Sequence, residues 1–127
     1  MHRLSGVEIL LVDDNVLNQK IVKFMIQKEG AETHTAINGK EAIAQMREHN
    51  FNVVLMDLHM PVLDGFEASH YIRKELKSNI PIIGITADPL LSEYEKCIAW
   101  GMNTCIAKPF ETTMLVDLIL DIVHKSN

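Results

Sequence analysis

Five side chains that could do chemistry together stand at the ends of short apolar runs in the sequence. Asp13 and Asp14 follow one run, Asp57 and Thr86 end two others, and Lys108 follows a fourth. Carboxylates crowded at one place raise one another's pKa and destabilise the fold, so such a cluster makes sense if a hard divalent cation occupies it. Mg²⁺ binds carboxylate and phosphate oxygens, and an ammonium and a hydroxyl beside it would help to stabilise a phosphoryl group.

A simpler role for some of these aspartates is to cap the helix that follows a strand. That role could account for Asp14 or Asn15 taken alone. It fits Asp57 poorly, because the segment Leu58–Pro61 follows Asp57 before the next cap residue, Asp64. Helix capping also gives no reason for several acids to gather at one place.

The elements that must position these residues alternate along the chain. Short β-branched apolar runs predict strands, and stretches with a helical spacing of apolar residues separate them. This alternation indicates βαβ units and a parallel sheet with helices on both faces. Ligands of such a sheet bind beyond the carboxyl ends of its strands. The predicted strands are Glu8–Asp13, Ala31–Ala36, Asn52–Asp57, Pro81–Thr86 and Asn103–Ala107.

Apolar spacing also predicts which side of each helix faces the sheet. Two of the predicted core stripes lie within Leu90–Ile98 and Leu115–Ile122. Val16 and Val22 fall off the stripe of the first helix and are expected at the surface. That first stripe consists of Leu17, Ile21, Phe24 and Met25.

Several residue types mark helix ends. Asn38 and Asp64 each precede a glutamate by three residues, the spacing of a capping box. Asp88-Pro89 would place a proline at the first helical position. Gly30 and Gly101 follow two helices, as C-terminal stops do.

Composition excludes several classes of protein. The chain has 127 residues, with 12 Lys and Arg against 17 Asp and Glu, for a formal net charge of −5. Its positive charges are scattered, so direct nucleic-acid binding and membrane contact are not expected. Its length predicts one domain, residues 1–127. The first residues lack the apolar core of a signal peptide, which favours a cytoplasmic protein.

The cysteines and histidines suggest packing and surface roles. Cys97 and Cys105 lie in apolar surroundings and are expected to be reduced and to pack as small hydrophobes, with a redox pair as the weaker alternative. The 6 histidines show no metal-ligand spacing with one another or with the cysteines. His34, His49, His70 and His124 are expected at the surface.

Four separated motifs resemble the receiver domains of two-component response regulators. They occur in the order of that family and cover Val7 to about Lys125. This resemblance implies an α/β fold, a (βα)5 doubly wound five-stranded parallel sheet with the flavodoxin-like order 2-1-3-4-5. The motifs are Leu11-Val12-Asp13-Asp14-Asn15, the run from Met56 to Gly65, Ile85-Thr86-Ala87 and Ala107-Lys108-Pro109-Phe110.

A closer resemblance is to the receivers attached to hybrid sensor histidine kinases. It rests on Asp13–Asn15 followed by Asn18, and on Cys97 before the run Ala99–Asn103. It suggests that this receiver could be one domain of a longer multidomain protein. A stand-alone single-domain response regulator is the alternative.

The resemblance implies a role for each residue of the acidic cluster. Asp57 would accept a phosphoryl group from a phosphohistidine of a histidine kinase or a histidine phosphotransfer protein. Asp14 and Asp57 would bind Mg²⁺, or Mn²⁺ in its place, through their side chains, with the backbone carbonyl of His59 as a further ligand. Asp13 would act mainly through a metal-bound water.

It also implies roles for the residues around the cluster. Thr86 would turn its hydroxyl toward the phosphoryl oxygens, Lys108 would pair with them, and a cis peptide bond would precede Pro109. His59 and Asp88 would flank the water that hydrolyses the aspartyl phosphate. The domain would then catalyse only its own phosphorylation and dephosphorylation and would not be an enzyme with turnover. In isolation it is expected to be a monomer or a weak dimer.

One position departs from the family pattern. Receivers commonly carry an aromatic residue three positions before the lysine, and here that residue is Cys105. The resemblance therefore does not imply, for this chain, the usual coupling between the threonine, here Thr86, and the rotation of an aromatic side chain. A partner helix is expected to dock at the loop Lys108–Phe110 and at the start of the first helix. The first-helix residues expected to be available to it are Asn15, Val16, Asn18, Gln19 and Val22.

Three other functions fit the sequence less well than a receiver domain does. An Mg²⁺-dependent phosphatase with an aspartate nucleophile has an Asp-x-Asp pattern on its first strand, whereas Asp13 and Asp14 are adjacent. An unphosphorylated, degenerate receiver would have lost a key residue, and none is lost here. A flavin protein would need a phosphate-cradling loop rich in Ser, Thr or Gly after the first strand.

Overall fold

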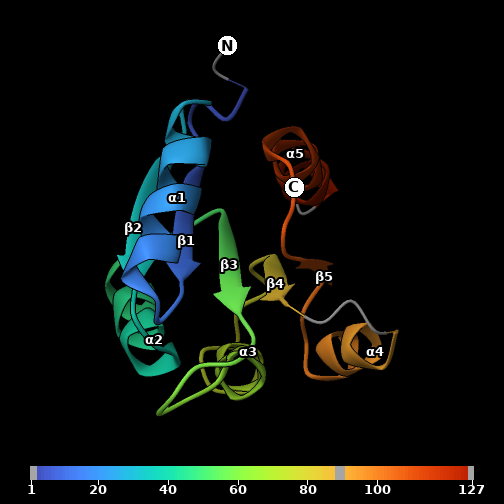
Figure 1. The fold of residues 1–127 in the computed structure, drawn as a ribbon. Helices are drawn as coiled ribbons and strands as arrows, with labels where there is room; N and C mark the ends of the chain where they lie inside the picture. Colours follow the sequence, from blue (N-terminus) through green and yellow to red (C-terminus); the bar gives the residue numbers. More distant parts are fainter. Residues whose placement is uncertain (1–2, 88–90, 126–127) are drawn as a thin grey trace.

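The computed structural model describes residues 3–87 and 91–125, in which strands and helices alternate (Figure 1). Each predicted strand is confirmed to within one residue at its ends. Three predicted features, the helix start at Asp88-Pro89, the water-path residue Asp88 and the stripe residue Leu90, lie outside the described residues. In chain order the elements are β1 (Glu8–Val12), α1 (Val16–Gln27), β2 (Glu32–Ala36), α2 (Gly39–Glu48), β3 (Val53–Asp57), α3 (Gly65–Lys74), β4 (Ile82–Thr86), α4 (Leu91–Ala99), β5 (Thr104–Ala107) and α5 (Thr112–Lys125).

The strands form one parallel sheet in the order β2-β1-β3-β4-β5, which confirms the predicted fold class. The chain runs from β1 to β2 on one side and then returns to β3 on the other side of β1. In an open parallel sheet, ligands bind beyond the carboxyl ends of the strands at such a switch point. The edge beyond β1 and β3 is therefore where a site is expected.

Helices cover both faces of the sheet because its central strands are apolar on both faces. Leu10 and Val12 belong to one buried cluster, and the alternate residues Ile9 and Leu11 belong to the other. Figure 1 shows α2, α3 and α4 on one side of the sheet and α1 and α5 on the other. None of the described helices is long and apolar enough to cross a bilayer.

The side of α1 that packs on the sheet differs from the prediction. Its buried residues are Gln19, Val22 and Ile26, so the predicted exposure of Val22 is wrong, whereas that of Val16 is confirmed. The predicted core stripe is also wrong, because most of it lies on the outer side of the helix. The exposed fractions there are 66% for Leu17, 51% for Ile21 and 63% for Phe24.

Gln19 gives the physical reason. Its amide nitrogen donates hydrogen bonds to two backbone carbonyl oxygens, that of Asp13 at 2.6 Å and that of Ala36 at 3.1 Å. These bonds satisfy a buried polar side chain and fix the rotation of α1 above the ends of β1 and β2. The spacing of apolar residues alone predicts that the opposite side of α1 packs on the sheet. That spacing contains no information about the hydrogen bonds of Gln19 to the strand ends.

The predicted core stripes of α5 and α4 agree with the structure to different extents. On α5 the predicted stripe Leu115–Ile122 is confirmed, with its members buried or partly buried. On α4 it is wrong in part, because Cys97 is buried but Tyr94 and Ile98 are 41% and 43% exposed. A short helix at the end of the sheet buries only a narrow strip.

The predicted caps that fall on described residues are confirmed. The Asn38 side chain accepts a hydrogen bond from the backbone N–H of Glu41 at 2.8 Å. Asp64 and Glu67 form a reciprocal capping box at the start of α3. Positive φ angles, which favour glycine, occur at Gly30 (93°) and Gly101 (104°).

Candidate functional site

Three acidic side chains meet beyond the carboxyl ends of β1 and β3. One carboxylate oxygen from each of Asp13, Asp14 and Asp57 lies within 4.8 Å of the others. Asp13 is buried, Asp57 is partly buried and Asp14 is exposed. This group, called the acid cluster below, is therefore anchored in the fold and open to solvent on one side.

Hydrogen bonds to both its side chain and its backbone hold Asp13 in place after β1. Its Oδ1 accepts the backbone N–H of Asn15 at 2.9 Å, and its backbone oxygen accepts the amide of Gln19. Its Oδ2 lies 3.7 Å from the ammonium Nζ of Lys108. Asp13 thus ties the start of α1, the end of β1 and the segment after β5 to one point.

Asp57 has surroundings that oppose its ionisation. Burial is the largest cause, and the negative charge of Asp13 and then of Asp14 adds to it. The backbone N–H of His59, 3.3 Å from Asp57 Oδ1, and the ammonium of Lys108 act in the other direction. Together these effects raise the pKa of Asp57 from 3.8 to about 6. The charge of Lys108 and the hydrogen bond from His59 therefore do not offset the effects of burial and of the neighbouring carboxylates on Asp57.

Helix α3 packs directly against the backbone of Asp57. A Cβ atom at Gly65, the first residue of α3, would lie 2.4 Å from the carbonyl oxygen of Asp57 and 2.9 Å from the Cα of Leu58. Both contacts are with backbone atoms, which cannot move aside as a side-chain end could. A side chain at position 65 would therefore displace Asp57, and the absence of one lets α3 support the end of β3.

Thr86 and Lys108 are brought to the same edge by the pairing of β4 with β5. Thr86 pairs with Ala107, and the backbone N–H of Lys108 donates to the Thr86 carbonyl at 2.7 Å. The predicted cis peptide bond between Lys108 and Pro109 is present. All the side chains that the sequence singled out at strand ends thus lie at one edge of the sheet.

One residue of this edge escaped the sequence analysis. Glu93 of α4 accepts the Thr86 hydroxyl at 3.3 Å, and its Oε1 is 2.8 Å from Nε2 of His59, whose side chain is at the rim as expected. Glu93 is far from the motifs in sequence, and an acid in the first turn of a helix is expected anyway from the helix dipole. No sequence pattern therefore distinguished it.

The two cysteines pack as the sequence predicts. Cys97 is buried and Cys105 is partly buried, and both are free thiols. Burial raises the pKa of Cys97 to about 12 and also raises the pKa of Cys105. Both thiols are therefore protonated and unreactive at neutral pH.

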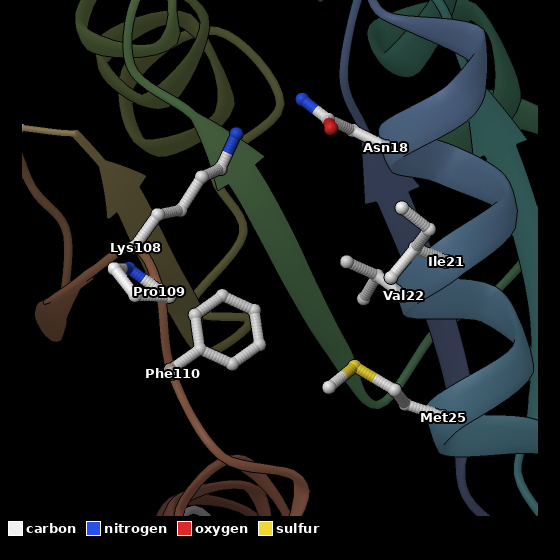
Figure 2. A pocket seen from close by; sticks show the side chains of 7 residues that line it. All are labelled: Asn18, Ile21, Val22, Met25, Lys108, Pro109 and Phe110. Atoms are coloured by element: carbon white, nitrogen blue, oxygen red, sulfur yellow. The ribbon is translucent and has the colours of Figure 1, made fainter.

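An apolar hollow lies beside the acid cluster, between α1 and the segment after β5. Figure 2 shows side chains of α1 on one side and Lys108, Pro109 and Phe110 on the other, with the Lys108 ammonium reaching toward the carboxyl end of β3. The α1 residues that line the hollow are Asn18, Ile21, Val22 and Met25.

Known proteins with the same features are similar to this chain along nearly its whole length. The sequence model of the response regulator receiver domain family matches residues 9–120. Hybrid signal transduction histidine kinase F of Dictyostelium discoideum is 37% identical over 124 residues, which cover 94% of this chain and 11% of that protein.

Solved structures agree with this match. The receiver domain of sensor histidine kinase PA1611 from Pseudomonas aeruginosa PAO1, which holds a magnesium ion in its active site cleft, is 35% identical, with a TM-score of 0.86 over 94% of this chain and 99% of that one. A chain in the co-crystal structure of the Saccharomyces cerevisiae phosphotransfer protein Ypd1 and the Ssk1 receiver domain is 28% identical, with a TM-score of 0.88, over 96% of this chain and 92% of that one.

The fold and the acid cluster define a receiver domain of two-component signalling. The chain belongs to the response regulator receiver domain family and is homologous to the receivers of hybrid histidine kinases. Receiver domains have histidine kinases or phosphotransfer proteins as partners, as in the Ypd1–Ssk1 complex. The chain spans between 10% and 14% of the length of curated relatives that it matches.

Proposed function

We propose that Asp57 accepts a phosphoryl group from a phosphohistidine of a histidine kinase or a histidine phosphotransfer protein. The observation that carries this proposal is the place of Asp57 at the switch point of the sheet, partly buried beside Asp13 and within the influence of Lys108. At this place the carboxylate of Asp57 can be reached from solvent. Groups held by the fold, such as the ammonium of Lys108, surround the position where the negative charge of the phosphoryl group would lie.

The acid cluster fits a hard divalent cation, and we propose Mg²⁺, with Mn²⁺ able to take its place. The side chains in the cluster offer oxygen ligands, which is the preference of Mg²⁺, and a cation there would offset both the burial and the neighbouring negative charges that raise the pKa of Asp57. Asp14 and Asp57 would hold the ion with the backbone carbonyl of His59, and Asp13 would act through a water. When bound, the ion would neutralise charge on the phosphoryl oxygens.

The transfer uses groups that the chain places at this edge. A carboxylate oxygen of Asp57 forms a bond to phosphorus, while the bond from phosphorus to the imidazole nitrogen of the donor breaks and that nitrogen keeps the electron pair. The Lys108 ammonium, 3.7 Å from Asp13 Oδ2, pairs with the incoming charge. The Thr86 hydroxyl, which donates a hydrogen bond to Glu93 in this structure, donates to a phosphoryl oxygen instead. Hydrolysis by water then restores the carboxylate and releases inorganic phosphate, without turnover of an external substrate.

The test is phosphorylation by a small donor. The protein is incubated with a small phosphodonor and Mg²⁺, and its intact mass is measured. We expect a gain of one phosphoryl group that is absent in Asp57→Asn and retained in the control Asp117→Asn, since Asp117 is exposed on α5. A phosphoryl group on Asp57→Asn, or sustained turnover of a phosphomonoester by the unmodified protein, would contradict the proposal.

We also propose that residues 1–127 form a single receiver domain of a longer hybrid histidine kinase. The support is the similarity to receivers of that class and the small share of each relative that the chain covers. A stand-alone response regulator of receiver size is the alternative, and the length of the natural transcript distinguishes them.

The outer side of α1, defined as Val16, Leu17, Ile21 and Phe24, is the surface we propose for the partner's phosphohistidine helix. These side chains are between 51% and 66% exposed and adjoin the hollow of Figure 2. A partner helix lying there would be next to the acid cluster, because α1 begins directly after Asp13–Asn15. The predicted docking surface on α1 is wrong in part, because Gln19 and Val22 are buried, whereas Val16 is exposed and belongs to both surfaces.

A further inference from the structure

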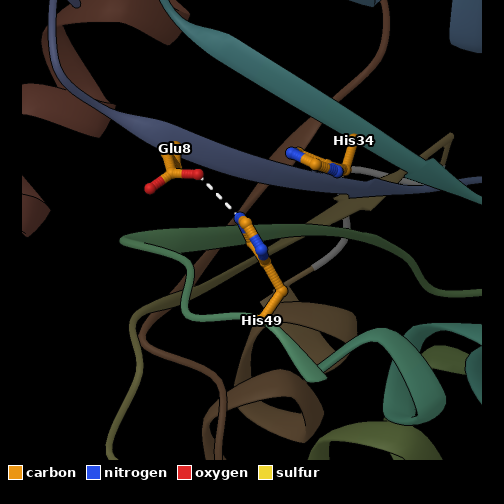
Figure 3. Close-up of side chains that lie close together, drawn as sticks. All are labelled: Glu8, His34 and His49. Carbon is orange, nitrogen blue, oxygen red and sulfur yellow. Dashed lines mark hydrogen bonds and ion pairs between the residues drawn. The ribbon is translucent and has the colours of Figure 1, made fainter. Parts of the chain in front are cut away.

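Two histidines and a glutamate meet at the end of the sheet opposite to the acid cluster (Figure 3). Glu8 is the first residue of β1, whose last residue precedes Asp13. His34 lies on β2, and His49 follows α2. We propose that Glu8, His34 and His49, called the histidine cluster below, bind a transition-metal ion with the ligand preferences of Zn²⁺.

The ligand atoms are already close to one another. His49 Nε2 is 2.7 Å from Glu8 Oε1, and the two imidazole centroids are 4.7 Å apart. One ligand atom from each of the three residues lies within 4.8 Å of the others. In a tetrahedral zinc site, bonds of 2.0–2.1 Å separate neighbouring ligand atoms by roughly 3.3 Å. Small side-chain rotations therefore suffice, and His49 is exposed enough to make them.

The sheet fixes two of the three ligands. Leu10 pairs with His34 across β1 and β2, and Glu8 lies two residues before Leu10, so Glu8 and His34 project from the same face of the sheet. The third ligand, His49, comes from the chain that leaves α2, which covers that face. Ligands carried on neighbouring strands keep their spacing better than ligands carried on loops.

Neighbouring groups orient the ligands. Asn52 Oδ1 accepts the backbone N–H of Glu8 at 2.7 Å, and the backbone N–H of Asn52 donates to the Glu8 carbonyl at 2.8 Å. The ring of Phe51 packs against both imidazoles, at 5.3 Å from His34 and 4.9 Å from His49. Such surrounding contacts restrict ligand orientation, as they do in known metal sites.

The histidine cluster and the acid cluster offer different ligand atoms and therefore favour different metal ions. Imidazole nitrogens suit Zn²⁺, Cu²⁺ and Ni²⁺, whereas Mg²⁺ prefers oxygen ligands only. Excess Mg²⁺ should therefore saturate the acid cluster and leave the histidine cluster available. A surface hollow adjoins Glu8 and His49, so an ion and a water as fourth ligand can enter from solvent; its other lining residues are Arg47, Glu48 and Asn50.

A surface ion pair explains less of the arrangement. Protonated His49 would pair with Glu8, with side chains 43% and 35% exposed, and such pairs contribute little. That ion pair involves only Glu8 and His49, and it leaves out His34, whose ring centroid lies 4.7 Å from that of His49. A shared cation accounts for all three residues.

The test is titration of the whole chain with Zn²⁺ in the presence of excess Mg²⁺, followed by calorimetry. We expect one equivalent to bind, and we expect His34→Gln and His49→Gln each to weaken binding at least about tenfold, the scale of the losses known for metal sites. The matched control His124→Gln changes an exposed histidine of α5 and should bind as the unmodified chain does. Imidazole NMR signals of His34 and His49 should shift with Zn²⁺ while that of His124 does not.

The outcomes that overturn the proposal are distinct. No binding by the unmodified chain, or equal binding by the His34→Gln and His49→Gln variants, would remove the site. Loss of Zn²⁺ binding in Asp57→Asn would assign the ion to the acid cluster. Failure of the unmodified chain to gain a phosphoryl group, with its Zn²⁺ binding intact, would count against the proposed function and leave the histidine cluster standing.

Discussion

The carboxyl of Asp57 is the group whose ionisation costs the folded protein most at the proposed site. Its pKa is raised to about 6 by burial and by the charge of Asp13 and Asp14. At neutral pH the folded chain therefore holds a negative charge that the unfolded chain, with its ordinary pKa of 3.8, holds more easily. Either a bound cation or removal of the charge by substitution would relieve this cost.

The raised pKa of Asp57 makes the stability of the fold depend on pH. Between pH 4 and pH 6 the folded chain binds more protons at Asp57 than the unfolded chain, so the free energy of unfolding falls as pH rises through this window. We expect Asp57→Asn, without divalent cations, to be more stable than the unmodified chain at pH 8 by about 1–2 kcal/mol after allowance for solvent screening. Urea unfolding measured from pH 4 to pH 8 checks this.

A control separates this effect from general changes in charge. Glu95→Gln removes an exposed carboxylate of α4, so its stability difference should vary little over the same range. An Asp57→Asn advantage that stayed constant from pH 4 to pH 8 would contradict the assigned pKa of about 6.

At the scale of elements, the strands and helix caps could be predicted because each depends on its own residues. β3 is apolar from Val53 to Met56, and Asn38 and Asp64 cap by local hydrogen bonds. The buried side of α1 could not be predicted, because Gln19 fixes it through carbonyl oxygens of two other strand ends. That information belongs to the tertiary structure and not to the spacing of apolar residues.

The residues of the site likewise fall into those that the sequence could predict and those that depend on tertiary structure. The acids, Thr86 and Lys108 end or follow strands, and parallel strands bring such residues together whatever the loops do. Glu93 and the histidine cluster depend on where a helix side and a helix end come to lie, so sequence separation hides them. The inference from spacing that the histidines form no metal site is therefore put in question by the meeting of His34 and His49 with Glu8.

Helix α4 is tied to the site by Glu93, and this contact competes with the proposed function. The Thr86 hydroxyl donates to Glu93 at 3.3 Å, whereas phosphorylation would require it at a phosphoryl oxygen. We expect Glu93→Ala to speed phosphorylation by a small donor roughly two- to tenfold, the equivalent of one ordinary hydrogen bond. Rates from intact mass measured over time check this.

Helix α4 also provides the control. Glu95→Ala removes an exposed acid two residues away on the same helix and should leave the rate unchanged. Equal acceleration by both variants would indicate a loss of general negative charge near the donor, and slower phosphorylation by Glu93→Ala would show that Glu93 supports Thr86 in its active position.

At the scale of the whole molecule, the sheet carries the acid cluster at one end and the outer side of α1 flanks that end. Four apolar side chains exposed on one side of a single helix are more than scattered surface residues, and such patches commonly mark interaction sites. The basic residue Lys28 lies over the ring of Phe24 at 5.3 Å, which gives this patch a polar edge. An interface of this kind has an apolar centre and a polar rim.

This docking surface predicts a difference between two phosphodonors. Leu17→Glu places a charge in the centre of the outer side of α1, where the side chain is 66% exposed and the fold should tolerate it. We expect transfer from a phosphohistidine protein to slow about tenfold or more, the cost of losing a central contact, while phosphorylation by a small donor stays unchanged. The control Ile98→Glu alters an exposed apolar residue of α4 and should affect neither reaction. Equal loss with both donors would indicate damage to the acid cluster, and no loss with either would exclude α1 as the docking surface.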